Sequence, residues 1–389
     1  MQMAEAWIRA VGPSSVFDSS RVREVVARTA GQPPCGVEKP VIRWSGCMTA
    51  HAMACDACRL EPDWACPVTR VLGQLCCEGL DLRSLCAANG VDRMQLGHLE
   101  HSFADLSAED VSLLKLTRRK YLREAVLEPV SGVKPTTWAS AAFVVRKFAP
   151  RAGAEQAIHR WASDEPEQVR KFLSKQCDPP EELYKSKPRA VYDLRALNRT
   201  LVRLPMRYLR LAEVISRMQP GHQLMAVDIA DGFTAVAVAA NSRGLLGLAE
   251  EAGPAQVRFV RMPFGLSVAP FVFSFVTAVL TQAVTAGVRS WTGAGVATGC
   301  FIDDLLVAFH PGSAGGSSVA ERVLGLVKAM GFAVSLPKLQ LPAQDVTYLG
   351  LSLRIADGGV EATLPALKRR MLGMHARWLG SSAVTTAAG

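Results

Sequence analysis

The stretch Gly299-Cys300-Phe301-Ile302-Asp303-Asp304-Leu305-Leu306-Val307-Ala308-Phe309 decides which fold to expect, because two adjacent carboxylates interrupt an apolar run. The apolar residues on both sides, bounded by glycine and by His310-Pro311-Gly312, predict two short strands joined by a tight turn. The acidic pair is then expected at the tip of a hairpin, in a turn conformation that tolerates Asp. Two acids at one tip need a counter-charge, and hard divalent cations bind carboxylate oxygens. For this fragment alone, a solvated Asp-Asp turn is the alternative.

A second acidic position lies upstream, in the stretch from Gln223 to Phe233. Here an apolar segment that predicts a strand ends in Asp228, and a glycine-aromatic pair, Gly232-Phe233, follows. A carboxylate at the end of a buried strand is poorly placed for solubility. It is well placed to share a metal ion with an acid on another strand.

The composition predicts a large intracellular protein. The chain has 389 residues, of which 49% are hydrophobic and 20% are charged, enough for a large core and two or three subdomains. The net charge of +9 favours a polyanionic partner.

Met1 to Ser15 lack the apolar core of a secretory signal. The uncharged stretch 262–288 is broken early by Pro263, Gly265 and Pro270, so we expect no membrane partner. Cytoplasm and nucleus are not distinguished.

Residues 1–100 are rich in cysteine and otherwise of unknown role. Eight of the ten cysteines lie between Cys35 and Cys86, and without a secretory signal we expect them to be reduced. A Cys-x-x-Cys pair lies near other ligand types, including His51, and four such ligands could form a tetrahedral zinc site. The predicted zinc ligands are Cys47, Cys55, Cys58 and Cys66.

The middle of the chain alternates predicted helices and strands with basic segments. Ser107 is expected to cap a helix with a basic face, and Ala141 to Val145 predict a strand. Residues 148–184 are interpreted as an insertion at a surface tip. Residues 185–217 hold nine basic residues against two acidic ones, which favours phosphate contact over a merely solvated face.

Further elements are expected downstream. A turn-rich loop over 261–270 leads into a predicted apolar helix over 271–284, and another helix is expected over 319–330. Residues 346–353 predict one strand, and a basic helix is expected to begin near Leu364.

Taken in this order, the segments resemble a reverse transcriptase of the retroelement kind, over about residues 118–379. The matching segments are two fingers strands at 139–147 and 189–198, motif A at 228–233, motif B at 262–270 with Phe273, motif C at 301–304, motif D at Lys338 and motif E at 349–350. The Pro-Phe-Gly-Leu form of motif B resembles retrotransposons of the LTR type or of the tyrosine-recombinase (DIRS-like) type. Phe301 stands where the family usually has Tyr.

The resemblance implies an α+β fold shaped like a right hand, with an antiparallel palm sheet backed by helices. Fingers are expected over 101–217, with the insertion at 148–184. The palm is expected over 218–355, with part of the fingers at 235–265, and the start of the thumb over 356–379. A mainly helical N-terminal region would cover 1–100 and a disordered tail 380–389. No RNase H, integrase or recombinase segment follows the thumb start, so we expect a fragment of a longer polyprotein or a degenerate element.

The resemblance also implies a metal-dependent reaction. Two Mg²⁺ ions, with Mn²⁺ as an alternative, would bind Asp228, Asp303 and Asp304, and the backbone carbonyl of Ile229 would complete one coordination sphere. Lys338 would protonate the leaving pyrophosphate, with a solvated lysine as the alternative. Asp231 is expected to be dispensable.

Four further residues are expected at the nucleotide. Arg189 would bind triphosphate oxygens, as would Lys147, for which Lys185 and Lys187 are competing candidates. Gly265 would let the backbone approach the nucleotide closely. Phe233 would exclude a 2′-hydroxyl, unless it is simply a core aromatic.

The expected partners are dNTPs and an RNA or DNA template with a primer. The expected function is RNA-directed DNA polymerisation for a retroelement. Two alternatives are kept, an inactive or domesticated nucleic-acid-binding remnant and an RNA-directed RNA polymerase.

Overall fold

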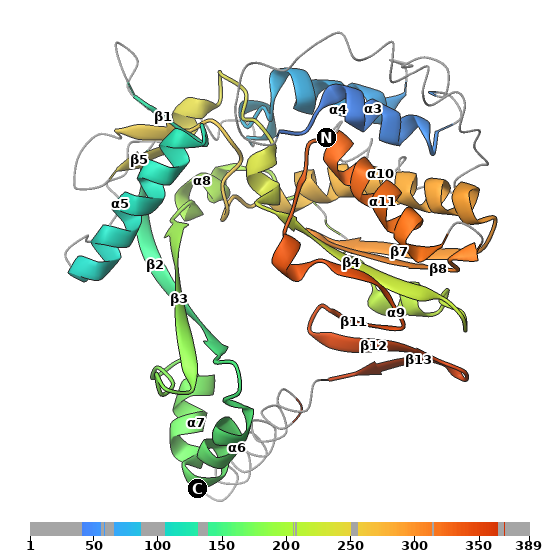
Figure 1. Cartoon of the computed structure of the whole chain (residues 1–389). Helices are drawn as coiled ribbons and strands as arrows, with labels where there is room; N and C mark the ends of the chain where they lie inside the picture. The colour runs from blue at the N-terminus through green and yellow to red at the C-terminus, as the bar shows by residue number, and fades with distance from the viewer. Residues whose placement is uncertain are drawn as a thin grey trace, which may run out of the picture.

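The fold is mixed α+β, as predicted, and the described strands form three antiparallel or mostly antiparallel sheets (Figure 1). The computed structural model describes residues 41–55, 58, 66–86, 106–130, 139–204, 206, 208–249, 256–312, 315–364 and 369. The basic helix expected beyond Leu364, the tail after Gly380 and most of the expected thumb segment lie outside these residues.

The central sheet has the strand order β10-β4-β8-β7. Its strands are β10 (Gln340–Ala343), β4 (Gln223–Ala230), β8 (Asp304–Phe309) and β7 (Val296–Phe301), and β9 (Ala333–Val334) pairs with the end of β4. Alternate side chains of a strand face opposite sides of a sheet. Leu305 and Val307 point into the largest hydrophobic core, whereas Leu306 and Ala308 point into a second core on the other face. Because β8 is buried on both faces, its residues 305–309 form a continuous apolar run in the sequence.

Two long helices cover one face of the central sheet, namely α10 (Ala269–Thr292) and α11 (Gly316–Ala329) (Figure 1). Among the described residues, α10 is the one helix long and apolar enough to cross a bilayer by length and composition alone. In its most apolar 18-residue window, 67% of the residues are buried inside the protein. The apolar surface of α10 is therefore used for packing against the sheet and the N-terminal helices.

A separate three-stranded sheet packs on the other face of the central sheet. Its strands are β11 (Asp345–Tyr348), β12 (Leu351–Ala356) and β13 (Gly359–Thr363). The single strand expected over 346–353 is thus wrong. Leu349 and Gly350 both have positive φ, 48° and 77°, and turn the chain back on itself. The second core joins Val346 and Tyr348 to the strands of the central sheet.

The remaining sheet has the order β1-β6-β5-β2-β3 and carries a long hairpin (Figure 1). The strands are β1 (Leu127–Pro129), β6 (Val257–Phe259), β5 (Gly247–Ala249), β2 (Ala139–Pro150) and β3 (Tyr184–Tyr192). Helix α5 (Ala108–Arg123) packs beside it, and the predicted cap is confirmed because the Ser107 hydroxyl accepts from the Asp110 N–H at 3.1 Å.

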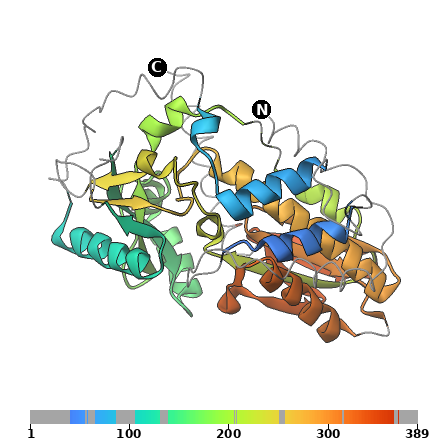
Figure 2. The ribbon, with the colours of Figure 1, turned by 90° about the horizontal axis from the view of Figure 1, so that it is seen from above.

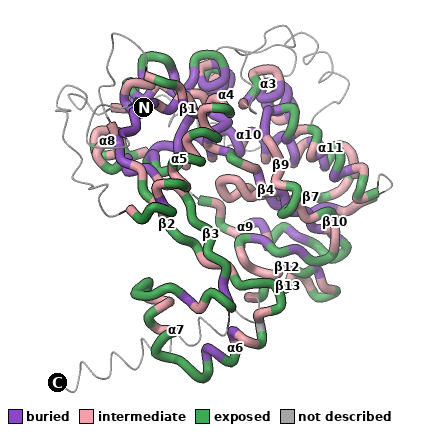
Figure 3. Tube along the Cα trace, turned by 60° about the vertical axis from the view of Figure 1, so that its left-hand side comes forward, coloured by how far each residue is buried: buried purple, intermediate pink, exposed green. Residues whose placement is uncertain are grey.

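The β2–β3 hairpin remains paired as far as Pro150 and Tyr184, so the strands run further than the sequence predicts. Beyond that pair, α6 (Glu155–Asp164) and α7 (Pro166–Leu173) enclose a small core of their own, built on Ile158 and Trp161. The hairpin is mostly exposed along its length, while buried residues concentrate around α10 and β4 (Figure 3).

The described N-terminal helices form a layer on the side of α10 that faces away from the central sheet (Figures 1 and 2). They are α3 (Trp44–Ala52), α4 (Pro67–Gly73), the π-helical η1 (Gln74–Glu78) and the short η2 (Arg83–Leu85). Met48 and Leu72 are fully buried in the same core as α10, so this layer shares the core of the central sheet. The other short helical segments are α8 (Arg195–Thr200), α9 (Leu211–Ile215), η4 (Gly232–Ala235), η5 (Arg243–Leu245) and η7 (Leu336–Lys338).

Helix α3 approaches α11 so closely that only glycine fits at the contact. A Cβ on Gly46 would lie 1.8 Å from the carbonyl oxygen of Ala329, which is backbone and cannot rotate away. We predict that Gly46→Ala lowers the free energy of unfolding by about 1–3 kcal/mol, although alanine is normally the better helix former. Chemical denaturation measures the change.

Gly325→Ala is the matched control, because Gly325 lies in α11 and a Cβ there meets nothing within 4 Å. This control should stabilise the protein by up to about 1 kcal/mol. Equal effects of the two substitutions would show that α3 does not dock on α11 as described.

Candidate active site

The β7–β8 hairpin ends in a two-residue turn formed by Ile302 and Asp303, and Phe301 pairs with Asp304. The hairpin is therefore confirmed, with Asp303 in its turn and Asp304 as the first residue of β8. The residue in the left-handed conformation is Ile302, with φ of 58°. This conformation is unfavourable for a β-branched residue and persists only where the surroundings enforce it, as they often do at functional sites.

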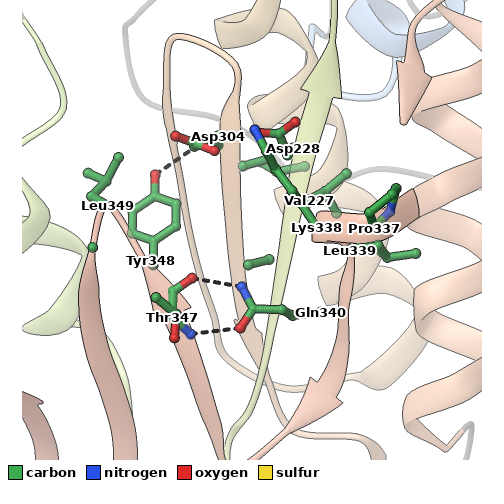
Figure 4. A pocket seen from close by; sticks show the side chains of 13 residues that line it. Val227, Asp228, Asp304, Pro337, Lys338, Leu339, Gln340, Thr347, Tyr348 and Leu349 are labelled. Carbon is green, nitrogen blue, oxygen red and sulfur yellow. Dashed lines mark hydrogen bonds and ion pairs between the residues drawn. The ribbon is translucent and has the colours of Figure 1, made fainter. Parts of the chain in front are cut away.

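The register of the central sheet brings acids from two strands together. Asp228 on β4 lies directly opposite Asp304 on β8. The backbone N–H of Ile229 donates to the carbonyl of Asp303 at 2.8 Å, which fixes the turn against the end of β4. Asp228 and Asp304 line an open pocket of about 600 Å³, shared with Lys338 and Tyr348 (Figure 4).

Partial burial makes the negative charges in this cluster unfavourable. Burial, followed by the charges of Asp303 and Asp228, raises the pKa of Asp304 to about 6. The pKa of Asp303 is also raised, first by burial and then by Asp228. The ligand atoms of the three carboxylates do not all lie within 4.8 Å of one another. These carboxylate oxygens repel one another and lie at a pocket that is open to solvent. They are therefore suitable ligands for a hard divalent cation.

One positively charged side chain already contacts this acidic cluster. The Lys338 ammonium, from η7, donates to the Asp228 carboxylate at 2.7 Å, and this hydrogen bond raises the pKa of Lys338 (Figure 4). The lysine is largely exposed, with 66% of its side chain accessible, whereas the Asp228 side chain is 14% exposed. The sequence predicted Lys338 at the site, and the structure brings it into contact with a predicted metal ligand.

Two residues that support the acids were missed by the sequence reasoning. The Tyr348 hydroxyl, on a side chain that is 2% exposed, donates to the backbone carbonyl of Asp304 at 2.8 Å. The Gln340 amide holds β11 in place through two 2.7 Å hydrogen bonds with the backbone of Thr347 (Figure 4). A tyrosine in an apolar strand gives no signal of such a role, because its partner is a backbone atom 44 residues away.

The predicted sugar-contacting residue Phe233 packs between two other rings. Its centroid lies 4.9 Å from that of Phe264, in the loop before α10, and 5.4 Å from that of Phe273, within α10. Phe233 is half-buried, and Phe264 is 45% exposed. Gly232 must remain a glycine here, because a Cβ would lie 2.4 Å from the ring of Phe273.

The loop that carries Gly265 is clamped by an asparagine. The Asn198 amide donates to the Gly265 carbonyl and accepts from the Ser267 N–H, each at 2.8 Å. Gly265 itself has φ of 92° and is exposed. The sequence placed Asn198 within a family segment without a role, because only the fold shows that α8 faces this loop.

Arg189 and Lys147 lie on the exposed β2–β3 hairpin, in a different sheet from the acids. The described contacts do not join either residue to Asp228, Asp303 or Asp304. Lys147 lies directly opposite Lys187 in the hairpin register, and Arg189 is two residues further along the strand, on the same face.

The structure brings three of the four predicted zinc ligands together. Cys47 is buried in the core beside Cys76 and does not belong to the ligand cluster found among the described residues. His51, one turn further along α3, joins Cys55, Cys58 and Cys66 instead. Sequence spacing could not separate these two residues, because both lie on α3 near the Cys-x-x-Cys pair.

Asp304→Asn tests the charge repulsion at the pocket. Because the pKa of Asp304 is raised, its negative charge destabilises the fold above about pH 6, and the penalty disappears as pH falls towards the ordinary carboxyl value of about 4. In EDTA at pH 7.5 we predict a higher melting temperature for Asp304→Asn than for wild type. The gain should vanish near pH 4.5. A lower melting temperature at pH 7.5 would contradict the repulsion.

Part of this chain matches a known protein family. Residues 175–353 match the family described as "Reverse transcriptase (RNA-dependent DNA polymerase)". The Gag-Pol polyprotein of Koala retrovirus is 27% identical over an alignment of 191 residues, and the match covers 47% of this chain and 11% of that polyprotein. The chain thus spans about a tenth of the length of this relative.

Solved structures of a foamy viral protease-reverse transcriptase are also similar. The complex with an RNA/DNA hybrid has a TM-score of 0.48 and 16% identity, covering 70% of this chain and 29% of that one. The complex with double-stranded DNA has a TM-score of 0.45 and 15% identity, covering 91% and 58%. The family match includes the hairpin, the end of β4 and the Lys338 turn. This chain therefore carries a domain of the reverse transcriptase family over residues 175–353.

Proposed function

We propose that this chain is an RNA-directed DNA polymerase of a retroelement, which extends a primer with dNTPs on an RNA or DNA template. The observation that supports it most is the pairing of Asp228 with Asp304 beside the Asp303 turn, inside the segment that matches the family. The Pro263-Phe264-Gly265-Leu266 loop favours a retrotransposon of the LTR or tyrosine-recombinase type.

Asp228 and Asp303 would hold two Mg²⁺ or Mn²⁺ ions, with support from Asp304 and the carbonyl of Ile229. When bound, the ions would activate the primer 3′-hydroxyl and stabilise the leaving pyrophosphate. The protein contributes a fixed frame for these oxygens, since Tyr348 anchors Asp304 and Ile229 anchors Asp303. Lys338 is held within reach of the same pocket, from which it could donate a proton to pyrophosphate.

The β2–β3 hairpin offers a surface for phosphate groups. Side chains two residues apart on a strand share a face, and directly opposed side chains share it too. Lys185, Lys187 and Arg189 therefore line one face of β3, with Lys147 opposite Lys187. Like charges placed directly opposite each other are unfavourable. An anionic ligand, either a triphosphate or a nucleic-acid backbone, would relieve this repulsion. All four residues thus contribute to one phosphate-binding surface, and the contact expected of Lys147 is shared with the other three.

Phe233 is proposed to select the sugar. Its ring is held from two sides, by Phe264 and Phe273, so it cannot readily move aside for a bulkier ribose. A polymerase that selects ribonucleotides would need a polar side chain here, because the 2′-hydroxyl both donates and accepts hydrogen bonds.

The decisive substitution is Asp303→Asn, which keeps the size of the side chain and removes its charge. We predict that primer extension on poly(rA) with an oligo(dT) primer falls by at least about 100-fold, because a metal ligand is lost. Asp231→Asn is the matched control and should extend at close to the wild-type rate. Asp231 has φ of 51°, a conformation that Asn tolerates equally well.

Extension by Asp303→Asn at the wild-type rate would refute the metal assignment. A folded wild-type chain that binds primer and template without extending it would support the remnant alternative instead.

Phe233→Val tests the sugar selection. The smaller side chain should raise the incorporation of ribonucleotides relative to deoxyribonucleotides, measured as the ratio of kcat/KM values for rNTP and dNTP. Phe332→Val is the control, because Phe332 is buried and contacts Phe273, the same ring that Phe233 contacts. An unchanged ratio in Phe233→Val would remove this role, and a preference for rNTPs in the wild type would favour an RNA polymerase.

A further inference from the structure

A second cluster of ligating side chains lies away from the acids, in the N-terminal helical layer. His51, Cys55, Cys58 and Cys66 each direct one ligand atom to a common point, and these atoms all lie within 4.8 Å of one another. Across the part of the chain that the structure describes, no other group of three or more His, Cys, Asp or Glu side chains meets this condition. His51 and Cys58 are buried, whereas Cys55 and Cys66 are half-buried.

The cluster is built from two helices and the segment between them. His51 lies in the last turn of α3, Cys55 and Cys58 follow that helix, and Cys66 is the residue before the first turn of α4. The Nε2 atom of His51 lies 3.4 Å from the Cys66 sulfur. Nε2 therefore faces the cluster and is the nitrogen placed to act as a ligand, whereas the other ring nitrogen, Nδ1, is buried with no hydrogen-bond partner among the described residues.

The donor set favours zinc. Three thiolates and one imidazole form one of the common closed tetrahedral zinc sites, with no position left for a substrate. At Zn–S bonds of about 2.3 Å, tetrahedral geometry places the sulfur atoms about 3.8 Å apart, inside the spread of the cluster. A neighbouring hydroxyl, Oγ1 of Thr69, lies 3.2 Å from the Cys58 sulfur and can donate to it as a thiolate.

We propose that His51, Cys55, Cys58 and Cys66 bind one structural Zn²⁺ ion that fastens α3 to α4. Helix α3 packs on both α10 and α11, the helices that back the central sheet. The ion would therefore lock the N-terminal layer onto the scaffold that carries the acids, without taking part in the reaction. This inference does not depend on the proposed polymerase activity.

Metal analysis of the purified full-length chain tests the site directly. We expect one zinc ion per chain by mass spectrometry of the metal content, after purification without chelators. Replacement by Co²⁺ should produce the thiolate charge-transfer and intense d–d absorption bands of a tetrahedral thiolate site. Cys66→Ser and His51→Ala should each lose these bands and most of the zinc.

Two cysteines serve as matched controls. Cys47→Ala removes a buried thiol of α3 that lies outside the cluster, and Cys77→Ser removes an exposed thiol of the neighbouring helix η1. Both variants should keep the full zinc content and the cobalt spectrum. Loss of zinc in Cys47→Ala together with retention in His51→Ala would overturn the proposed ligand set.

A measurement on the wild type guards against variants that fail to fold. Titration with an organomercurial should release the zinc as three thiols react, and chelation should lower the melting temperature because a bound metal stabilises the folded state. A chain that carries no zinc, whether its thiols are free or joined as a disulfide, would overturn the proposal.

Discussion

The structure depends on one electrostatic constraint, which is that three carboxylates are held together where water cannot fully solvate them. Asp228 and Asp304 face each other across two paired strands, and the Asp303 turn is tied to the end of β4 through the N–H of Ile229. Burial and mutual repulsion raise the pKa values of Asp303 and Asp304. The protein tolerates this because the strands beneath are packed on both faces, so the acids cannot separate without disrupting two cores.

Several features follow from that constraint. Ile302 takes a conformation that a β-branched residue avoids, which lets Asp303 occupy the turn beside β4. Tyr348 reaches from the second sheet to hold the backbone of Asp304, and Lys338 places a positive charge on Asp228. Helix α10 lies between the central sheet, which carries the acids, and the N-terminal helices. These helices pack into the same hydrophobic core as α10. The described N-terminal region is thus part of the scaffold of the site.

Sequence reasoning found those features that are written in local patterns. The apolar run broken by Asp303 and Asp304 predicted the hairpin, and Ser107 predicted the start of α5. Order along the chain then suggested that Asp228 would join the hairpin. The position of Asp228 at the end of an apolar strand indicates that it could share a metal ion with an acid on another strand. That this other strand belongs to the hairpin follows from the resemblance, since no local pattern reveals which strands pair.

What the sequence missed depends on contacts between distant segments. The apolar pattern continues through Leu349-Gly350 and predicts strand there, although the backbone reverses at these two residues. Spacing alone cannot distinguish Cys47 from His51 as a ligand, because it does not show which side of α3 faces α4. The partners of Tyr348 and Asn198 are backbone atoms, which carry no mark in the sequence.

A crystal structure of the chain soaked with Mn²⁺ tests the central claim most directly, because the anomalous signal of the metal locates it without assumptions. The account predicts a peak bound by the carboxylates of both Asp228 and Asp303, with Lys338 displaced from Asp228. A structure with Mn²⁺ bound to neither acid, or to one of them alone, and with Lys338 still on Asp228, would contradict it.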